Sequence, residues 1–174
     1  MRGHPANKIK AYVIIDDQSN HSLAKPNFFD LLKLDAEAKP FSLKTCSETS
    51  QGSGRHAHDL IIESLDGTRS YTLPVPTECD AIWDNREEIP TLNGAREFPH
   101  LQPIADKIPE LCPEAEILLL LGRDAPPLHK IQESWNRLKN APWTQRLHLG
   151  WVVIGNTCLD GAHKPDKVSA YQTQ

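Results

Sequence analysis

Two adjacent aspartates, Asp16 and Asp17, follow an apolar run in the stretch YVIIDDQSNHSLA. A carboxylate at the end of a buried strand is unfavourable unless nearby groups compensate its charge. Such a pair can be an acidic turn whose carboxylates accept main-chain N–H groups. It can also be chemical: when two carboxylates lie close together, one stays ionised and activates water while the other stays protonated and polarises a peptide carbonyl. The pair alone favours the turn, so the choice depends on the surrounding sequence.

The sequence around Asp16 matches part of the pattern of an aspartic peptidase, which reads two apolar residues, Asp, Ser or Thr, and Gly. The run Ile14-Ile15-Asp16 supplies the first three positions. Asp17 stands where the hydroxyl residue is expected, and Gln18 stands where the glycine is expected. A later segment, LLLLGRD, matches the apolar-apolar-Gly strand that packs behind the catalytic loop in such folds. Together the two segments favour the catalytic interpretation of the aspartate.

The elements that must position this loop are predicted to be mostly strands. Apolar alternation or continuity indicates strands over 8–15, 41–46, 116–124 and 146–155, the last with Gly150 as a bulge. Within 58–75, two strand-like runs flank Asp66-Gly67, a dipeptide that favours a type I′ hairpin turn. The polar stretch 47–54 indicates a loop or a hairpin tip.

Helical signals are short. Pro26 fits the first turn of a helix over 26–35, and 101–108 can form one helical turn inside an irregular region over 76–113. The segment 129–140 fits either a helix or an extended chain. This order predicts a mostly β domain with five to seven strands and one or two short helices, and it lacks the β-α-β alternation of a parallel sheet.

Length and composition limit the class of protein. With 174 residues, of which 39% are hydrophobic and 24% charged, the chain reads as one globular domain. A net charge of -4 gives no electrostatic case for nucleic-acid binding or for an anionic membrane surface. No apolar run approaches the roughly 20 residues of a membrane helix, and the N-terminus lacks the apolar segment of a signal peptide. We therefore expect a cytoplasmic protein without a membrane partner.

Neither a metal nor a cofactor is expected. The four cysteines form no CxxC pair and read as free, mostly buried thiols, and His56 and His58 are the only close histidines. Arg123 and Asp124 are interpreted as a local ion pair, and Trp151 as a core residue. The sequence contains no phosphate-binding loop, GxGxxG, HExxH or GxSxG motif.

Four stretches carry a resemblance to a known family: VIIDDQSNHSLA at the aspartate, FFDLLKL after it, LLLLGRD late in the chain, and APWTQRLHLGWVVIG near the end. In their order and spacing they resemble the retropepsin-like aspartic peptidase region of BEL/Pao-type retrotransposon polyproteins. The last stretch is the most distinctive, because the family carries Leu-Gly-Trp followed by an apolar strand and Gly. The resemblance covers roughly residues 10–160.

The resemblance implies a closed β-barrel or sandwich with one or two short helices, forming half of a homodimeric aspartic peptidase. It divides the chain into an N-terminal extension over 1–9, a retropepsin-like domain over 10–160, and a C-terminal linker or tail over 161–174. The implied activity is endopeptidase cleavage of the chain's own polyprotein, in the cytoplasm or inside retroelement particles.

By the same resemblance, Asp16 corresponds to the catalytic aspartate and Ser19 to a small residue that helps to orient its carboxylate. Gly52, Ser53 and Gly54 lie where the family places its flap, and Leu121 with Gly122 forms the supporting strand. Because only one such aspartate motif is present, the site must be completed by a second chain on a two-fold axis.

Asp17 and Gln18 depart from the family pattern. An ionised Asp17 cannot donate the hydrogen bond that the hydroxyl residue makes across the axis, and a dimer would gather four carboxylates there. Gln18 adds a side chain where glycine permits close backbone approach and positive φ. A catalytically silent dimerisation or spacer module therefore remains the alternative function, and divalent-cation binding by the clustered carboxylates is a third.

Overall fold

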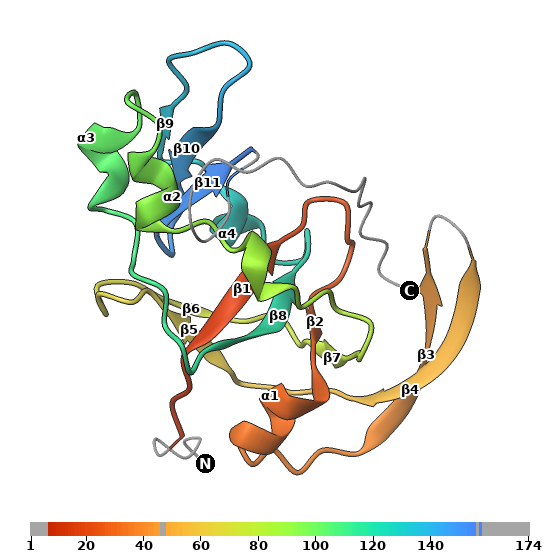
Figure 1. The fold of residues 1–174 in the computed structure, drawn as a ribbon. Coiled ribbons are helices and arrows are strands. Elements are labelled where there is room, and N and C mark those ends of the chain that lie inside the picture. Colours follow the sequence, from red (N-terminus) through yellow and green to blue (C-terminus); the bar gives the residue numbers. More distant parts are fainter. Residues whose placement is uncertain (1–6, 46–47, 156, 158–174) are drawn as a thin grey trace.

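The computed structural model describes residues 7–45, 48–155 and 157, and within them the chain is mostly β with a few short helices (Figure 1). The strands are β1 (Ala11–Ile15), β2 (Leu23–Ala24), β3 (Ala38–Lys44), β4 (Thr49–Arg55), β5 (Ile61–Glu63), β6 (Ser70–Thr72), β7 (Thr77–Glu78), β8 (Glu116–Leu121), β9 (Glu133–Trp135), β10 (Trp143–Arg146) and β11 (Trp151–Ile154). The helices are α1 (Pro26–Leu31), α2 (Leu92–Arg96), α3 (Gln102–Ala105) and α4 (Pro126–His129), with a 3-10 turn at Arg86–Glu88. These strands form four separate sheets in the described residues.

The central sheet has the strand order β1-β8-β2-β7, so β8 lies between two strands that adjoin the aspartate pair in sequence. β1 runs parallel to β8, and β2 runs antiparallel to it. The chain leaving β1 must therefore cross the C-terminal end of β8 before it enters β2. The sequence pattern gave no indication of a parallel sheet, yet both β1–β8 and β2–β7 are parallel pairs.

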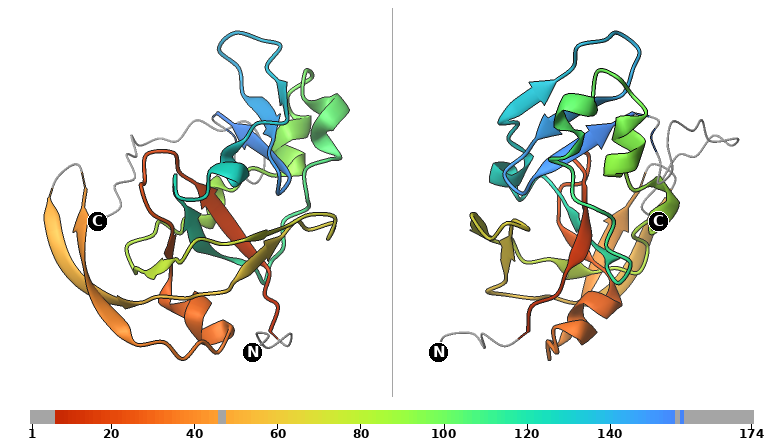
Figure 2. Two further views of the ribbon diagram at one scale, coloured as in Figure 1. Left: turned by 180° about the vertical axis from the view of Figure 1, so that it is seen from behind. Right: turned by 60° about the vertical axis from the view of Figure 1, so that its left-hand side comes forward.

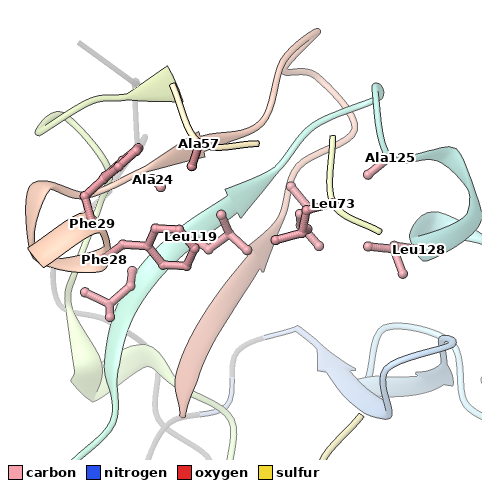
Figure 3. Packing of buried hydrophobic residues seen from close by; sticks show 10 residues of the cluster. Ala24, Phe28, Phe29, Ala57, Leu73, Leu119, Ala125 and Leu128 are labelled. Carbon is pink, nitrogen blue, oxygen red and sulfur yellow. The ribbon is translucent and has the colours of Figure 1, made fainter. Parts of the chain in front are cut away.

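The run ILLLL in β8 is continuously apolar because both of its faces are covered. Leu118, Leu119 and Leu121 pack in one cluster with Phe28 and Phe29 of α1 (Figure 3). Ile117 and Leu120 pack in a second cluster, whose other buried members are Leu23, Cys79, Ile82 and Ile89. The predicted strand ended by Gly122 is confirmed, and so is a helix that begins at Pro26, although it ends at Leu31.

Of the stretch 47–54, predicted to be a loop or a hairpin tip, residues 49–54 do lie in the hairpin β3–β4, but they form its second strand, β4, and not its tip. Seven residue pairs join the two strands, from Ala38 with Arg55 to Lys44 with Thr49. The glycines and serines of β4 have low strand propensity, which is why the stretch reads as a loop. A cross-strand partner compensates, because Phe41 lies over Gly52, with its ring 3.1 Å from the position of an added Cβ.

The hairpin β5–β6 is present as predicted, but its turn type is not. A type I′ turn requires positive φ at both Asp66 and Gly67, and only Gly67 has it, at 67°. The connection is longer than two residues, and the Ser64 N–H donates to the Arg69 carbonyl. Hydrogen bonds from Ser64 and Thr68 to the Asp66 carboxylate lower its pKa to about 2.

The predicted strand over 146–155 is instead a turn and a strand, because β10 ends at Arg146 and β11 begins at Trp151. Gly150, with φ of 149°, lies in the turn between them and is not a bulge within a strand. The segment 129–140, left open by its sequence, contains β9 and an extended loop. Both views in Figure 2 place β9, β10 and β11 beside α2 and α3 at one end of the molecule.

A third buried cluster joins these helices to the three-stranded sheet. Its members are Ala95, Leu101, Ile104, Ala105, Ile108 and Val153. Trp135 and Trp151 are partly buried against this cluster, so Trp151 lies at the margin of the core. Across the described residues, the helices are too short and too polar for any of them to cross a membrane.

Candidate functional site

Asp16 is the first residue after β1 and lies where the chain begins to cross the end of β8. Its main-chain N–H donates to the Leu121 carbonyl at 3.0 Å, which continues the pairing of Ile15 with Leu121. Its half-buried carboxylate accepts the main-chain N–H of Gln18 at 2.8 Å. The backbone on both sides of Asp16 therefore holds the carboxylate at the end of the central sheet.

Asp17 and Gln18 are both exposed, and they interact with each other. The Gln18 side-chain amide donates to the Asp17 carboxylate at 2.9 Å. Among the described residues other than glycine, positive φ occurs at Lys33, Asp59 and Asn140. The expected need for glycine at position 18 is therefore wrong for this loop, since Gln18 has ordinary backbone geometry and its main chain contacts Asp16.

The rest of the loop, from Ser19 to Ser22, is bound to the segment that follows β8. The Arg123 N–H donates to the Ser19 carbonyl at 2.9 Å, and the Ser19 hydroxyl donates to the His21 carbonyl at 2.7 Å. The buried Ser22 hydroxyl accepts the Gly122 N–H at 3.1 Å. Ser19 thus stabilises the loop backbone, because its hydroxyl bonds with the main chain of His21.

Asp124 receives two hydrogen bonds from this loop and lies beside a histidine. Its carboxylate accepts the Ser22 main-chain N–H at 2.9 Å and the Ser22 hydroxyl at 2.6 Å. His21 Nδ1 lies 3.0 Å from the same carboxylate. The interpretation of Arg123 and Asp124 as a local ion pair is wrong, because the Asp124 carboxylate contacts Ser22 and His21 in the loop between β1 and β2.

Gly122 is required here by close packing. A Cβ at this position would lie 2.6 Å from the carbonyl carbon and oxygen of His21, so the loop backbone rests directly on the glycine. The Gly122 carbonyl accepts a hydrogen bond from His129 Nε2 at 2.8 Å, which ties α4 to the same point. Leu121 and Gly122 therefore support the loop as predicted from the sequence.

His21 connects Asp124 to a hydroxyl, since its Nε2 lies 3.0 Å from Thr77 Oγ1. The order Asp, His, hydroxyl is that of a serine-hydrolase relay. Thr77, however, is only 3% exposed and pairs with Leu23 inside the sheet, so its hydroxyl cannot meet a substrate. The three residues form a structural connection between the loop, β7 and the end of β8.

The expected flap residues lie in β4. Gly52, Ser53 and Gly54 pair with Phe41, Pro40 and Lys39 of β3, so they are not the tip of the hairpin. The strands end near Thr45 and Glu48, where the Thr45 N–H donates to the Glu48 carbonyl. Gly54 is buried, and a Cβ there would lie 2.3 Å from the Glu78 carbonyl oxygen. A hairpin is present in the expected part of the chain, but its turn comes earlier than the glycines.

Two surface depressions lie away from Asp16. One, of about 460 Å³, is lined by residues that include Asp35, Glu37, His56 and His58. The other, of about 510 Å³, is lined by residues that include Lys25, Asp84, Arg86 and Glu116. Within the described residues, His, Cys, Asp and Glu side chains form no group of three or more that could hold a metal ion.

The sequence predicted the strand end at Asp16 and the strand β8 behind it, but did not predict the contacts of His21, Ser22 and Thr77. The segment LLLLGRD contained the only signal for this network, since Asp124 follows directly after Gly122. In the part of the chain that the structure describes, the site is an aspartate at a sheet end, and Asp16 lines neither of the two surface depressions. No protein-family model, curated protein or solved structure matches this chain.

Proposed function

We propose that the chain is one half of a homodimeric aspartic endopeptidase that processes a retroelement polyprotein. The observation that carries this proposal is the position of Asp16, which ends β1 while the loop that follows crosses β8 into β2. Its carboxylate is held by the main-chain N–H of Gln18, and its own N–H by the Leu121 carbonyl. The resemblance to the BEL/Pao peptidase region, with its retropepsin-like fold, supports the same function.

The chemistry requires two copies of Asp16 on a two-fold axis. The ionised carboxylate takes a proton from a bound water, whose oxygen adds to the peptide carbonyl carbon while the protonated carboxylate gives its proton to the carbonyl oxygen. Collapse of this tetrahedral intermediate breaks the C–N bond, and the leaving nitrogen takes up a proton. The products are a carboxylic acid and an amine, without a metal or a cofactor.

A second chain is needed because the sequence offers no second motif. Asp66-Gly67 and Asp160-Gly161 each lack the preceding apolar pair and the hydroxyl residue. Asp66 is held in the β5–β6 turn by Ser64 and Thr68, which leaves it structural. A C2 dimer would place both copies of Asp16 at one interface.

The second candidate is a catalytically silent dimerisation or spacer module of the polyprotein. It is favoured by Asp17, whose exposed carboxylate stands where a hydroxyl donor would cross the axis and instead accepts the Gln18 side chain. Like charges near one axis oppose each other, so four carboxylates disfavour close approach of the loops at neutral pH.

The deciding experiment is cleavage of a peptide library by the wild-type chain at about pH 5, followed by mass spectrometry of the products. We expect Asp16→Asn to abolish cleavage and to leave the circular dichroism spectrum unchanged. Asp17→Asn is the matched control, because it removes the neighbouring carboxylate without touching the shared proton.

Inhibition by a statine-containing peptide, which mimics the tetrahedral intermediate, should accompany the cleavage. Cleavage that survives Asp16→Asn would refute the peptidase proposal. A folded, dimeric wild type without any cleavage would favour the silent module instead.

A further inference from the structure

The base of the β3–β4 hairpin is held by one cluster of charges, formed by Arg55, Glu78 and Asp30 and called here the Arg55 clasp. Arg55 is the last residue of β4, Glu78 belongs to β7, and Asp30 belongs to α1. Arg55 Nε and Nη2 donate to the two carboxylate oxygens of Glu78 at 2.9 and 2.8 Å, and Nη1 donates to Asp30 at 2.7 Å. The cluster therefore joins the hairpin to two separate elements.

Every nitrogen of the Arg55 guanidinium is engaged. Nη2 also donates to the Pro26 carbonyl, and the main-chain N–H of Arg55 donates to Glu78. The guanidinium carbon lies 4.8 Å from the centre of the Phe29 ring. A fork-to-fork pair of this kind fixes direction as well as distance, which a lysine ammonium could not do.

Within the clasp, the Arg55–Glu78 pair is shielded on both sides, whereas each of the other ion pairs of the described residues has at least one more exposed side chain. The side chains of Arg55 and Glu78 are 22% and 18% exposed, against 78% and 43% for the pair formed by Lys8 and Glu63. The hydrogen bonds from Arg55 lower the pKa of Glu78, and the carboxylates raise the pKa of Arg55 further above its usual range.

Gly54, which precedes Arg55, is closely packed at the same junction. Gly54 places its backbone against Glu78, where a Cβ would lie 2.3 Å from the carbonyl oxygen. Beyond this point most residues of β3 and β4 are exposed, although Leu43 packs against the second core cluster. In Figure 1 the two strands rise from this base along one side of the molecule, toward the end where the loop after β1 lies. A small rotation at the base is therefore amplified along the hairpin.

We infer that Arg55 is a positioning residue, which sets the direction of the β3–β4 hairpin relative to the aspartate loop by its fork-to-fork bond to Glu78. Its consequence for substrate binding rests on the proposed function. In the proposed peptidase, the β3–β4 hairpin would bind the peptide main chain beside Asp16. A hairpin held less firmly at Arg55 would then bind substrate more weakly, while the chemical step would stay intact.

Hydrogen exchange measured by mass spectrometry tests the structural part without any catalysis. In Glu78→Gln we expect the amides of residues 38–55 to exchange at least about tenfold faster than in the wild type, while those of β8 keep their rate. Asp30→Asn, which changes only the outer and 62% exposed partner, should give a smaller change of the same kind. Glu63→Gln is the matched control, because it breaks an exposed ion pair on the other hairpin.

Faster exchange confined to residues 38–55 supports the inference. Exchange that stays unchanged there, or that rises equally in β8, overturns it, since the clasp would then contribute nothing or only overall stability.

Kinetics test the consequence for the substrate. Arg55→Lys keeps the charge and loses the fork, so we expect KM to rise by about tenfold with kcat within about twofold of the wild type. A fall in kcat with unchanged KM contradicts a positioning role. If the wild type cleaves nothing, the proposed function fails, and the exchange experiment alone still decides whether Arg55 positions the hairpin.

Discussion

Asp124 shows how a single residue can fix a loop without taking part in chemistry. It accepts two hydrogen bonds from Ser22 and lies 3.0 Å from His21 Nδ1, on the other side of the end of β8 from Asp16. Ser22 is fully buried, so its donors have no water to replace the carboxylate. The position of Asp16 therefore depends on a residue that lies far away in the sequence.

We expect Asp124→Ala to lower the free energy of unfolding by at least about 2 kcal/mol, because a buried donor that loses its partner costs about 1–3 kcal/mol. Urea denaturation followed by tryptophan fluorescence measures the change. Asp106→Ala is the control: this 79% exposed carboxylate pairs with Arg96, which is itself 53% exposed, and its loss should cost under about 1 kcal/mol. Equal losses in the two variants would show that Asp124 does not anchor the loop.

At the scale of elements, contacts at the junctions between the small sheets fix how the sheets lie relative to one another. The central sheet, the β3–β4 hairpin and α1 meet at the Arg55 clasp, where Glu78 keeps a lowered pKa. A carboxylate whose pKa is lower in the folded chain stabilises the fold above its unfolded pKa, and this contribution is lost as the pH falls through the folded value.

We therefore expect Glu78→Gln to favour local opening of the base of the β3–β4 hairpin by about 3 kcal/mol at pH 7, as breaking a shielded ion pair does. Below the ordinary carboxyl pKa of 4.5 the difference from the wild type should shrink, because Glu78 then takes up a proton whenever the clasp is open, and it should vanish once the pH falls through the lower pKa that Glu78 has in the folded chain. The ratio of the hydrogen-exchange rates of residues 38–55 in the variant and the wild type, taken between about pH 7 and 3, measures the difference, and Glu63→Gln should show little change across this range. A difference that is constant with pH would mean that the charge of Glu78 does not hold the clasp.

Local signals in the sequence sufficed for some elements and not for others. Pro26 marks the start of α1 through its own backbone restriction, which needs no partner, and Gly122 marks the end of β8 because it follows directly on an unbroken apolar run. The strand β4 could not be found in this way, because its glycines and serines become extended only by pairing with β3. The sequence after Arg146 gives no sign of a turn, because Leu149 and Gly150 are apolar. In the structure they lie where the chain reverses between β10 and β11.

The candidate site was likewise only partly predictable from the sequence. Asp16 and its supporting strand could be predicted because short patterns carry them. The contacts of Asp124 with Ser22 could not, because they join residues more than a hundred positions apart and depend on the crossing of the loop over β8.

For the whole molecule, the proposed function makes activity a property of two chains. One chain carries one aspartate of this kind, so an isolated chain cannot share a proton between two carboxylates. The state of assembly and the rate of cleavage should then change together.

We expect the rate of cleavage per chain to rise with protein concentration and to level off where sedimentation shows a dimer, as mass action requires. Mixing the wild type with an excess of Asp16→Asn should suppress cleavage, because most wild-type chains then pair with an inert partner. A rate per chain that is independent of concentration in a strictly monomeric protein would contradict the proposal.

The parallel pairing of β1 with β8 also governs when the site can form. Ile15 pairs with Leu121, and the loop after Asp16 is bound by Asp124, so both contacts need residues made about a hundred positions later. A ribosome adds about 5–20 residues each second, so roughly 5–20 s separate the synthesis of the aspartate from that of its support. Throughout that interval the nascent chain holds Asp16 on an unpaired strand. The order of the strands thus delays assembly of the loop that follows Asp16 until most of the domain has been translated.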